Sequence, residues 1–386
     1  MKSKSIFLFF VALVFSAYSC SPKGDGSVSE VIVNGNTMYV FSLNELKSDT
    51  VTLPLSSLVE NCVLVQLETR DDAFFTPGAT TVTEKYIGVR SRTYLLFDRS
   101  GKFLCPIGAI GQGLGEYAIS LYDDIIDDKN DLVYLGAFME NKIMMYNTSG
   151  KFIKDIVAPH RLQKPKMFLS DGILTVVHLP FGDDKAVAIQ FDAITGEVLK
   201  ELSPPPAHLI AQSFDSELIS TRNASGVFDF LHTSSDTLYH FDVKNNTILP
   251  AFMVTSTTEG MWKRYFPLNK NMFLTSVNMY DRDLRRIVSI GTVATDLKSK
   301  TSSWIKVVND YYGNMSVPIG SVSNGYWVQN IQPEQLIEDI ENRLAQRSCT
   351  ENDKQVLNKT LSTLKENENN VVFIGKLKKE INAKLW

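Results

Sequence analysis

A hairpin pattern that recurs along the chain constrains its fold more than any other feature. An apolar strand ends in Asp or Asn, a Gly-containing turn follows, and a second strand begins with Lys and an aromatic residue, first at residues 95–104 and again at 144–153. Asp or Asn side chains cap such turns and Gly adopts the positive φ that they need, which we expect for Gly101 and Gly150. The capping residues of these two copies and of three weaker ones are Asp98, Asn147, Asp192, Asp242 and Asp296. Successive capping residues are 49, 45, 50 and 54 positions apart, a period that predicts the blades of a β-propeller.

Each period contains further short strand patterns between turn residues, for example residues 131–135 and 173–177. This spacing fits about four strands per repeat. The strands are nearly continuous apolar runs, as expected where each blade is covered on both faces by its neighbours. No long polar linker separates the repeats, and 44% of the residues are hydrophobic. The sequence therefore predicts an all-β fold with a single propeller domain over residues 31–386.

The first 19 residues have the features of a secretory signal peptide. Two lysines precede an apolar segment at 6–15, and small residues follow up to Cys20. As a helix this segment would be about 15 Å long, half of the hydrocarbon core of a bilayer, which disfavours a membrane-spanning anchor. The junction resembles the lipoprotein box of bacteria, with Ala17 where Leu is usual. This resemblance implies a lipid on Cys20 and a flexible tether over residues 20–30; a plainly cleaved signal is the alternative.

The charge and the cysteines of the chain exclude two classes of protein. The 386 residues include 39 Lys and Arg against 43 Asp and Glu, so the basic surplus of a nucleic-acid binder is missing and no nucleic-acid partner is expected. If Cys20 carries lipid, the three cysteines that remain are widely spaced and imply no disulfide framework or metal site. We expect Cys62 and Cys105 to be buried as small apolar residues.

The segment after the first hairpin carries the most distinctive motif. It reads Gly-Ala-Ile-Gly-Gln-Gly-Leu-Gly-Glu-Tyr over residues 108–117. Together with the hairpin at 95–104 and with stretches at 64–69 and 370–378, it resembles the six-bladed β-propeller lipoproteins of Bacteroides-type bacteria, relatives of NHL-repeat propellers. The family motif usually has Pro where this chain has Leu114. The spacing alone allows six or seven blades, whereas the resemblance implies six, in an exported lipoprotein of unassigned activity.

The motif residues with an expected structural or binding role are Gly111, Gln112, Gly113, Gly115, Glu116 and Tyr117. Closely spaced glycines let the backbone bend tightly and approach another group. We expect that group to be a neighbouring blade, with Glu116 accepting hydrogen bonds from turn amides and the ring of Tyr117 packed. In the alternative interpretation these side chains lie at a channel rim and bind a ligand.

Residues 333–366 interrupt the last blade with a helical pattern. Pro333 suits the first position of a helix, and Thr350 with Asp353 is typical of a capping box that starts a second one. We expect this helical hairpin to shield one edge or end of the propeller, because its apolar residues share one face. The apolar, β-branched run at 371–376 then predicts a closing strand of the final blade.

No local motif indicates a catalytic site, a metal site or a cofactor. The signatures GxSxG, HExxH and GxGxxG and the P-loop are missing, and the five histidines have no metal-ligand spacing. The run of Asp residues between 123 and 131 lacks the order of a calcium loop, so we expect a hairpin turn there. Arginines that would bind an anion if they met at the channel mouth are Arg90, Arg92, Arg282, Arg285 and Arg286.

Two classes of function stay open on the sequence alone. The favoured one is a non-catalytic binding or scaffold module, tethered to the outer membrane through Cys20 and facing the periplasm or the exterior. It would engage a glycan, peptide or protein through one end of its channel. The alternative is an extracytoplasmic enzyme, carbohydrate-active or otherwise hydrolytic or lytic, whose site is assembled from several blades.

Overall fold

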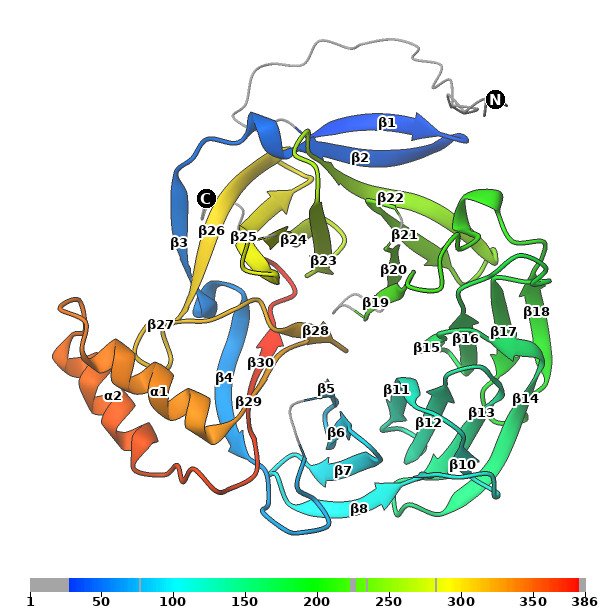
Figure 1. Cartoon of the computed structure of the whole chain (residues 1–386), viewed down its shortest axis with the longest axis horizontal. Helices are drawn as coiled ribbons and strands as arrows, with labels where there is room; N and C mark the ends of the chain where they lie inside the picture. Colours follow the sequence, from blue (N-terminus) through cyan, green and yellow to red (C-terminus); the bar gives the residue numbers. More distant parts are fainter. Residues whose placement is uncertain (1–27, 76–77, 223–226, 234, 282, 382–386) are drawn as a thin grey trace, which may run out of the picture.

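The computed structural model describes residues 28–75, 78–222, 227–233, 235–281 and 283–381. It consists mainly of β-strands, which form six blades around a central channel (Figure 1). In each blade the strands follow one another from the channel to the outside. The all-β fold that the repeat predicts and the six blades that the resemblance implies are both confirmed.

Five blades follow each other along the chain in inner-to-outer order. Blade 1 contains β5 (Ala79–Val82), β6 (Tyr86–Arg90), β7 (Tyr94–Asp98) and β8 (Phe103–Ile107). Blade 2 contains β11 (Leu121–Asp127), β12 (Leu132–Ala137), β13 (Glu140–Asn147) and β14 (Phe152–Leu162). Blade 3 contains β15 (Lys166–Ser170), β16 (Ile173–Val177), β17 (Ala188–Asp192) and β18 (Val198–Leu202). Blade 4 contains β19 (Leu218–Arg222), β20 (Phe228–His232), β21 (Thr237–Asp242) and β22 (Thr247–Thr255). Blade 5 contains β23 (Met261–Pro267), β24 (Met272–Asp281), β25 (Arg286–Asp296) and β26 (Thr301–Asn309).

The recurring hairpin is the outer hairpin of each of these blades, formed by its third and fourth strands. The side chain of Asp98 accepts hydrogen bonds from amides two and four residues further on, at 2.8 and 3.1 Å. Asp296, in the most degenerate copy, accepts bonds from amides two and three residues further on, both at 3.1 Å. The positive-φ position of the five turns is held by Gly101, Gly150, Gly196, Asn246 and Lys300. The turn chemistry predicted from the repeat is therefore confirmed.

Apolar side chains pack between neighbouring blades and not in one central core. Six clusters of buried side chains occupy the six interfaces between blades. Between blades 1 and 2, for example, Tyr94 and Leu96 of β7 pack with Val133 of β12. Burial of both faces of each blade explains why its strands are apolar runs without strict alternation.

The ring closes in blade 6, which combines strands from distant parts of the chain. It contains β28 (Ser321–Ser323), β29 (Tyr326–Ile331), β30 (Val371–Leu377) and β4 (Val59–Gln66). The strand β30 pairs antiparallel with β29 on one side and with β4 on the other, where Val372 lies opposite Val65. The closing strand predicted at 371–376 is confirmed, and both of its edges are paired.

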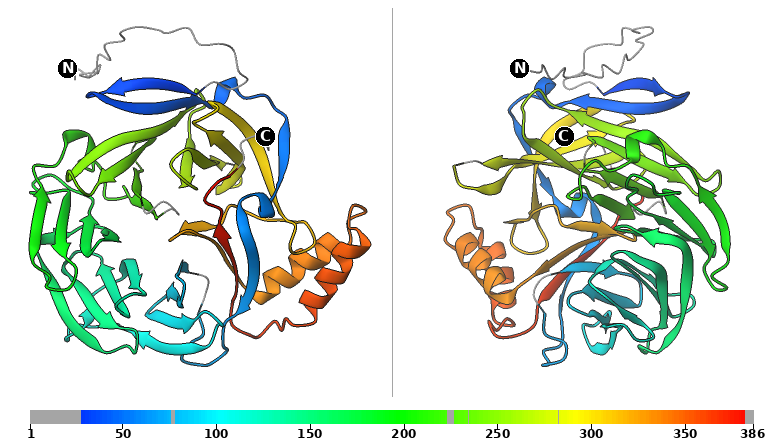
Figure 2. Two further views of the ribbon diagram at one scale, coloured as in Figure 1. Left: turned by 180° about the vertical axis from the view of Figure 1, so that it is seen from behind. Right: turned by 45° about the vertical axis from the view of Figure 1, so that its right-hand side comes forward.

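Two helices are inserted between β29 and β30 and lie outside the ring beside β4 (Figures 1 and 2). They are α1 (Pro333–Leu344) and α2 (Glu351–Leu361). The capping box of Thr350 and Asp353 at the start of α2 is formed as predicted. Leu336, Ile340 and Leu357 are buried in the cluster between blades 5 and 6. The hairpin thus shields one side of the ring, as the apolar face predicts.

The N-terminal segment adds strands to the outer edges of blades 4 and 5. The sequence does not predict this feature. The hairpin of β1 (Ser29–Val33) and β2 (Asn36–Ser42) adds to blade 4 through parallel pairing of β2 with β22. The strand β3 (Thr50–Pro54) then runs parallel to β26 of blade 5. The remaining short elements are η1 (Leu43–Glu45), η2 (Leu55–Ser57), η3 (Ala207–Leu209), β9 (Ala109–Ile110), β10 (Glu116–Tyr117) and β27 (Met315–Ser316).

The outer turn of blade 1 packs on β4, and a comparison of two glycines with similar backbone angles tests this contact. Gly101 and Gly172 have φ of +91° and +78°. A Cβ on Gly101 would lie 2.2 Å from the carbonyl oxygen of Gln66, whereas one on Gly172 would meet no atom within 4 Å. Ala costs roughly 1–2 kcal/mol at either position for the left-handed backbone, and overpacking adds about 1–3 kcal/mol at Gly101 alone.

Urea unfolding should therefore find Gly101→Ala less stable than Gly172→Ala by at least about 1 kcal/mol. Equal free energies of unfolding for the two variants would contradict the contact between this turn and β4.

Candidate functional site

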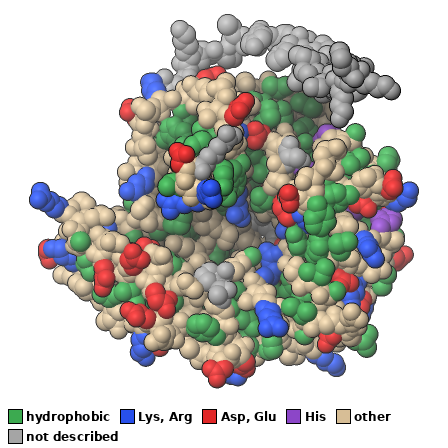
Figure 3. Space-filling model, viewed as in Figure 1, with side chains coloured by type: hydrophobic (Ala, Val, Ile, Leu, Met, Phe, Trp, Pro, Cys, Tyr) green, Lys and Arg blue, Asp and Glu red, His purple; other side chains and the backbone are tan. Residues whose placement is uncertain are grey.

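One face of the ring carries the loops that surround the channel opening. Because strands within a blade are antiparallel, the loops from second to third strands and the connections between blades lie at the same face. The loops at 91–93, 108–120 and 203–217 belong to it, and we call it the mouth face. Figure 3 shows a hollow at the centre of the ring, with Lys, Arg and hydrophobic side chains around it.

The channel contains a cavity of about 740 Å³. Its wall includes early residues of the inner strands, such as Ala79, Lys166 and Ser321, and late residues of second strands, such as Arg90 and Asn330. These ends of the strands lie toward the mouth face. Late residues of inner strands, such as Phe266 and Ser323, also line the cavity, so it extends from the mouth face along the channel. Its volume falls within the range of about 300–1,000 Å³ that is usual for ligand sites.

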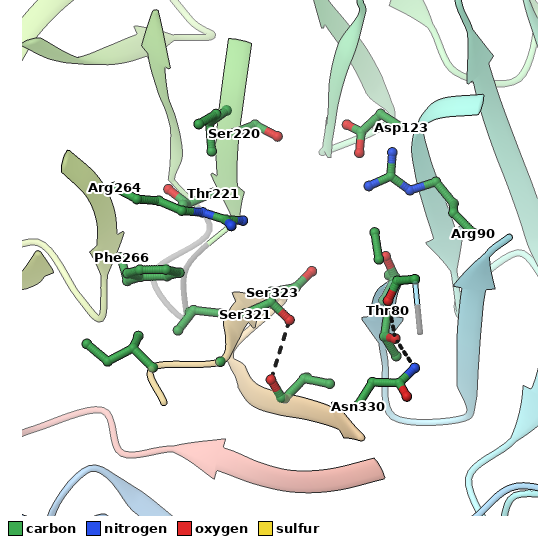
Figure 4. A pocket seen from close by; sticks show the side chains of 18 of the residues that line it. Thr80, Arg90, Asp123, Ser220, Thr221, Arg264, Phe266, Ser321, Ser323 and Asn330 are labelled. Atoms are coloured by element: carbon green, nitrogen blue, oxygen red, sulfur yellow. Dashed lines mark hydrogen bonds between the residues drawn. The ribbon is translucent and has the colours of Figure 1, made fainter. Parts of the chain in front are cut away.

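Arg264 of β23 points into the cavity (Figure 4). Its guanidinium lies over the ring of Phe266, 5.3 Å from the centroid. Desolvation by the surrounding protein lowers the pKa of Arg264 below its usual value, but a guanidinium stays charged at neutral pH. Among the residues that the structure describes, Arg264 makes no hydrogen bond or ion pair. Arg264 is exposed to the cavity, so its charge is accessible to an anionic ligand.

Arg90 lies across the cavity from Arg264 (Figure 4) and is already paired. Its Nε is 2.9 Å from Oδ1 of Asp124. It also donates to the backbone carbonyl of Tyr122, and Tyr94 donates to the second oxygen of Asp124 at 2.9 Å. Arg90 is therefore held in place at the wall by a buried carboxylate.

The two carboxylates of the cavity wall are engaged by neighbouring groups. Glu217 accepts hydrogen bonds from Nζ of Lys164 at 2.6 Å and from the hydroxyl of Tyr122 at 3.2 Å. Asp123 accepts one from the backbone amide of Met167 at 2.7 Å. These carboxylates fix the start of the inner strands of blades 3 and 4.

Hydroxyl and amide groups make up much of the remaining wall. Asn330 donates to the hydroxyl of Thr80 at 2.8 Å (Figure 4). The hydroxyl oxygens of Thr221 and Ser323 and the amide oxygen of Gln329 are buried and have no hydrogen-bond partner within the described parts of the chain. The wall of the cavity thus combines hydrogen-bond donors and acceptors from several blades.

A cluster of aromatic side chains lies beside the cavity at the mouth face. Tyr122 stacks on Phe138 with ring centroids 5.4 Å apart, and Phe214 meets Phe138 edge-on at 5.9 Å. Lys166, which lines the cavity, lies over the ring of Tyr122 at 5.3 Å. Phe214 is 59% exposed. We call Tyr122, Phe138 and Phe214 the aromatic rim.

The Gly-rich motif connects blade 1 to blade 2. Glu116 accepts a hydrogen bond from the amide of Gly113 at 2.7 Å, and a Cβ on Gly111 would lie 2.0 Å from the same carboxylate. Tyr117 is buried in the cluster between the two blades, and its hydroxyl donates to the carbonyl of Arg92 at 3.0 Å. Gln112 is exposed. This geometry agrees with the structural interpretation of the motif, and none of its residues lines the cavity.

The structure does not bring the predicted arginines together. Arg90 lines the cavity, whereas Arg92 lies exposed in the loop after β6. Arg285 and Arg286 are exposed at the β24–β25 turn and do not line the cavity. Arg282 lies outside the described residues, as does Cys20. Arg264, which the sequence analysis did not single out, occupies the position expected of them, because no local motif marks an inner strand.

The later part of the acidic run forms the predicted hairpin turn, in which the carboxylates bind nearby amides and hydroxyls. The prediction is wrong for Asp123 and Asp124, which are buried in the strand β11. Asp127 accepts bonds from the two amides that follow Asp128, at 3.0 and 3.3 Å. Asp128 accepts bonds from Thr83 and from Glu84 of the neighbouring blade, at 2.7 and 2.8 Å. In the described ranges no group of three or more His, Cys, Asp or Glu side chains is placed to hold a metal ion.

The described cysteines are free thiols: Cys62, Cys105 and Cys349. Cys62 is buried and Cys105 is half-buried, so the expected burial holds fully for Cys62 and in part for Cys105. A search of the described residues for a helix long and apolar enough to cross a membrane finds none.

These features define a six-bladed β-propeller with a cavity in its channel that is lined in part by cations and hydroxyl groups. The profile of the family described as "Domain of unknown function (DUF4934)" matches residues 38–376, and the chain belongs to this family.

Two solved structures from Bacteroides resemble the chain. A candidate exported protein of Bacteroides fragilis is 14% identical with a TM-score of 0.54, over 86% of this chain and 100% of that chain. A member of the DUF4221 family from Bacteroides vulgatus is 12% identical with a TM-score of 0.45, over 92% and 100%. The first likeness concerns the fold alone. A comparison with curated proteins finds no match.

The structural interpretation of the motif predicts graded losses of stability at Tyr117. Tyr117→Phe removes one hydrogen bond and should cost about 1 kcal/mol, while Tyr117→Ala should cost about 3–5 kcal/mol through lost packing between blades 1 and 2. The exposed Gln112→Ala should stay within about 0.5 kcal/mol of the wild type. Denaturant unfolding of the three variants checks this, and a wild-type stability of Tyr117→Ala would contradict the structural role.

A second measurable consequence comes from His178, which follows β16 and is fully buried. Neither ring nitrogen has a hydrogen-bond partner among the described residues. Burial lowers the pKa of His178 from 6.5 to about 4. The unfolded chain therefore takes up a proton at higher pH than the folded chain. The contribution of neutral His178 to the free energy of unfolding is complete above pH 6.5 and is lost as the pH falls toward about 4.

The loss should be of order 3 kcal/mol over this window. His178→Leu removes the titrating group, so the difference in unfolding free energy between wild type and variant should depend on pH between 6.5 and 4. A difference that is constant over this range would show that His178 does not titrate in this way.

Proposed function

We propose that the protein is a binding module that takes a polar, anionic ligand into the cavity at the mouth face. The observation that carries this proposal is Arg264, a charged guanidinium that points into the cavity without a counter-ion among the described residues. A ligand carboxylate would form two parallel hydrogen bonds with it, the strongest arrangement for such a pair. Lys166 at the same wall adds a second positive charge.

The state of the carboxylates favours binding over hydrolysis. General acid or base catalysis needs a carboxyl group that exchanges a proton with the substrate. Glu217 is instead held by Lys164 and Tyr122, and Asp123 by a backbone amide. Both carboxylates therefore support the wall of the cavity.

We also propose that the module works outside the cytoplasm, on a lipid tether at the outer membrane. The signal-like segment at 1–19 and the lipoprotein-like junction at Cys20 support this, as does the likeness to a candidate exported protein. The relation to NHL-repeat propellers is likewise a proposal that rests on sequence resemblance. Labelled fatty acid should enter the wild type and not Cys20→Ala; equal labelling would contradict the tether.

The cavity site is tested by screening the purified protein against immobilised acidic glycans and acidic peptides. Arg264→Gln should lose at least about tenfold in affinity for the anionic probes that the wild type retains, since a hydrogen bond to a charged group contributes about 1.5–3 kcal/mol. The matched control is Arg286→Gln, on the exposed β24–β25 turn, which should bind as the wild type does. Retention that is the same in all three proteins, or no retention of any anionic probe, would overturn the proposal.

A further inference from the structure

We infer that the ligand is an acidic saccharide, a short oligosaccharide with uronic acid units. Arg264 would hold its carboxylate while a sugar ring stacks on the aromatic rim. This inference rests on the proposed function and names the ligand chemistry of the same cavity. Two features beyond Arg264 carry it: the hydroxyl groups of the wall and the aromatic rim beside it, of which Phe214 is exposed.

The wall offers the groups that recognise a polyhydroxylated molecule. Side chains with hydroxyl or amide groups come from β5, β19, β28 and β29: Thr80, Ser220, Thr221, Ser321, Ser323, Gln329 and Asn330. A hydroxyl both donates and accepts, and so pairs with a sugar hydroxyl in either direction. Thr221 and Ser323 are only 6% and 8% exposed, and their hydroxyls have no partner in the described chain.

Part of the apolar lining is buried in the core of the ring. Leu218, Val322 and Val328 are each less than 6% exposed, because they belong to the core clusters between blades. Phe266 is 4% exposed and lies beneath the guanidinium of Arg264. Ala79 and Pro318 are exposed and Ile219 and Ile319 are half-buried, so the accessible wall combines polar and apolar surface. A sugar ring, with hydroxyl groups at its edge and C–H groups on its faces, fits such a mixed wall.

The aromatic rim supplies the flat apolar surface that the cavity wall lacks. The faces of aromatic rings carry partial negative charge, which attracts the slightly positive C–H groups on the face of a sugar ring. Phe214 is the most exposed member, and Lys164 lies over its ring at 5.1 Å. Tyr122 joins the rim to the cavity through its hydrogen bond to Glu217. A cavity of about 740 Å³ with such a rim suits a chain of several sugar units more than a single one.

Isothermal titration calorimetry with three defined acidic oligosaccharides tests the inference: trigalacturonate, an alginate trisaccharide and a hyaluronan tetrasaccharide. Neutral α-1,4-galactotriose serves as the matched uncharged ligand for trigalacturonate, and a triglutamate peptide as the acidic non-sugar. The proteins are the wild type, Arg264→Gln and Phe214→Ala, with Tyr280→Ala as the control for an exposed aromatic residue outside the rim. Thermal melting of each variant verifies that it is folded.

We expect the wild type to bind at least one of the acidic saccharides, at least tenfold more tightly than galactotriose or triglutamate. Arg264→Gln should lose at least tenfold in affinity for that saccharide, Phe214→Ala at least fivefold, and Tyr280→Ala less than twofold. Affinity should fall as salt rises from 50 to 300 mM, since the carboxylate is recognised by charge.

Three results would overturn the inference. Binding of triglutamate in an Arg264-dependent way, without binding of the saccharides, would leave the proposed anionic site standing and exclude a sugar ligand. If trigalacturonate is the acidic saccharide that binds most tightly, an equal affinity for neutral galactotriose would exclude recognition of the carboxylate. Absence of binding to every acidic probe would count against both the inference and the proposed function.

Discussion

The pairing of β4 with β30 is the interaction on which the rest of the structure depends. It joins residues 59–66 to residues 371–377, the most distant strands of the chain that share a blade. Without it blade 6 would lack its outer strand, and the interfaces of blade 6 with blades 5 and 1 would lose the side chains that β4 buries there, Val59, Cys62 and Val65. Because each blade is stabilised only by its neighbours, the closed ring is also what holds the inner strands around one channel. The cavity is a consequence of that closure, since its wall comes from all six blades.

The polar groups around the channel have two different roles. Most of the charged ones hold the ring together: Arg90 with Asp124 fixes β6 beside β11, and Lys164 with Glu217 fixes the chain before β15 to the chain before β19. Buried ion pairs of this kind contribute little net stability but define which groups lie where. Arg264 differs, because no carboxylate in the described chain compensates it. Its side chain is exposed to the cavity, where a ligand carboxylate can reach it.

Much of the fold could be predicted from the sequence, because it is encoded by local chemistry. The turns at Asp98 and Asn147 repeat the same capping residues, and the capping box at Thr350 marks α2 without any tertiary information. The site could not be predicted in the same way. Arg264 stands in an inner strand of blade 5, where the repeat is most degenerate, and most of its neighbours in the cavity come from other blades, more than 40 residues away. Likewise, the sequence does not predict that β2 and β3 extend blades 4 and 5, because parallel pairing on an outer edge has no local signature.

The central claim is that an anionic ligand occupies the channel end beside Arg264. A crystal structure of the protein with the acidic oligosaccharide that it binds most tightly tests this directly. The account predicts electron density within the cavity, with a carboxylate against the guanidinium of Arg264 and a sugar ring on the aromatic rim. A ligand bound at the opposite face of the ring, or on the outer edges of the blades with the cavity occupied by water alone, would contradict it.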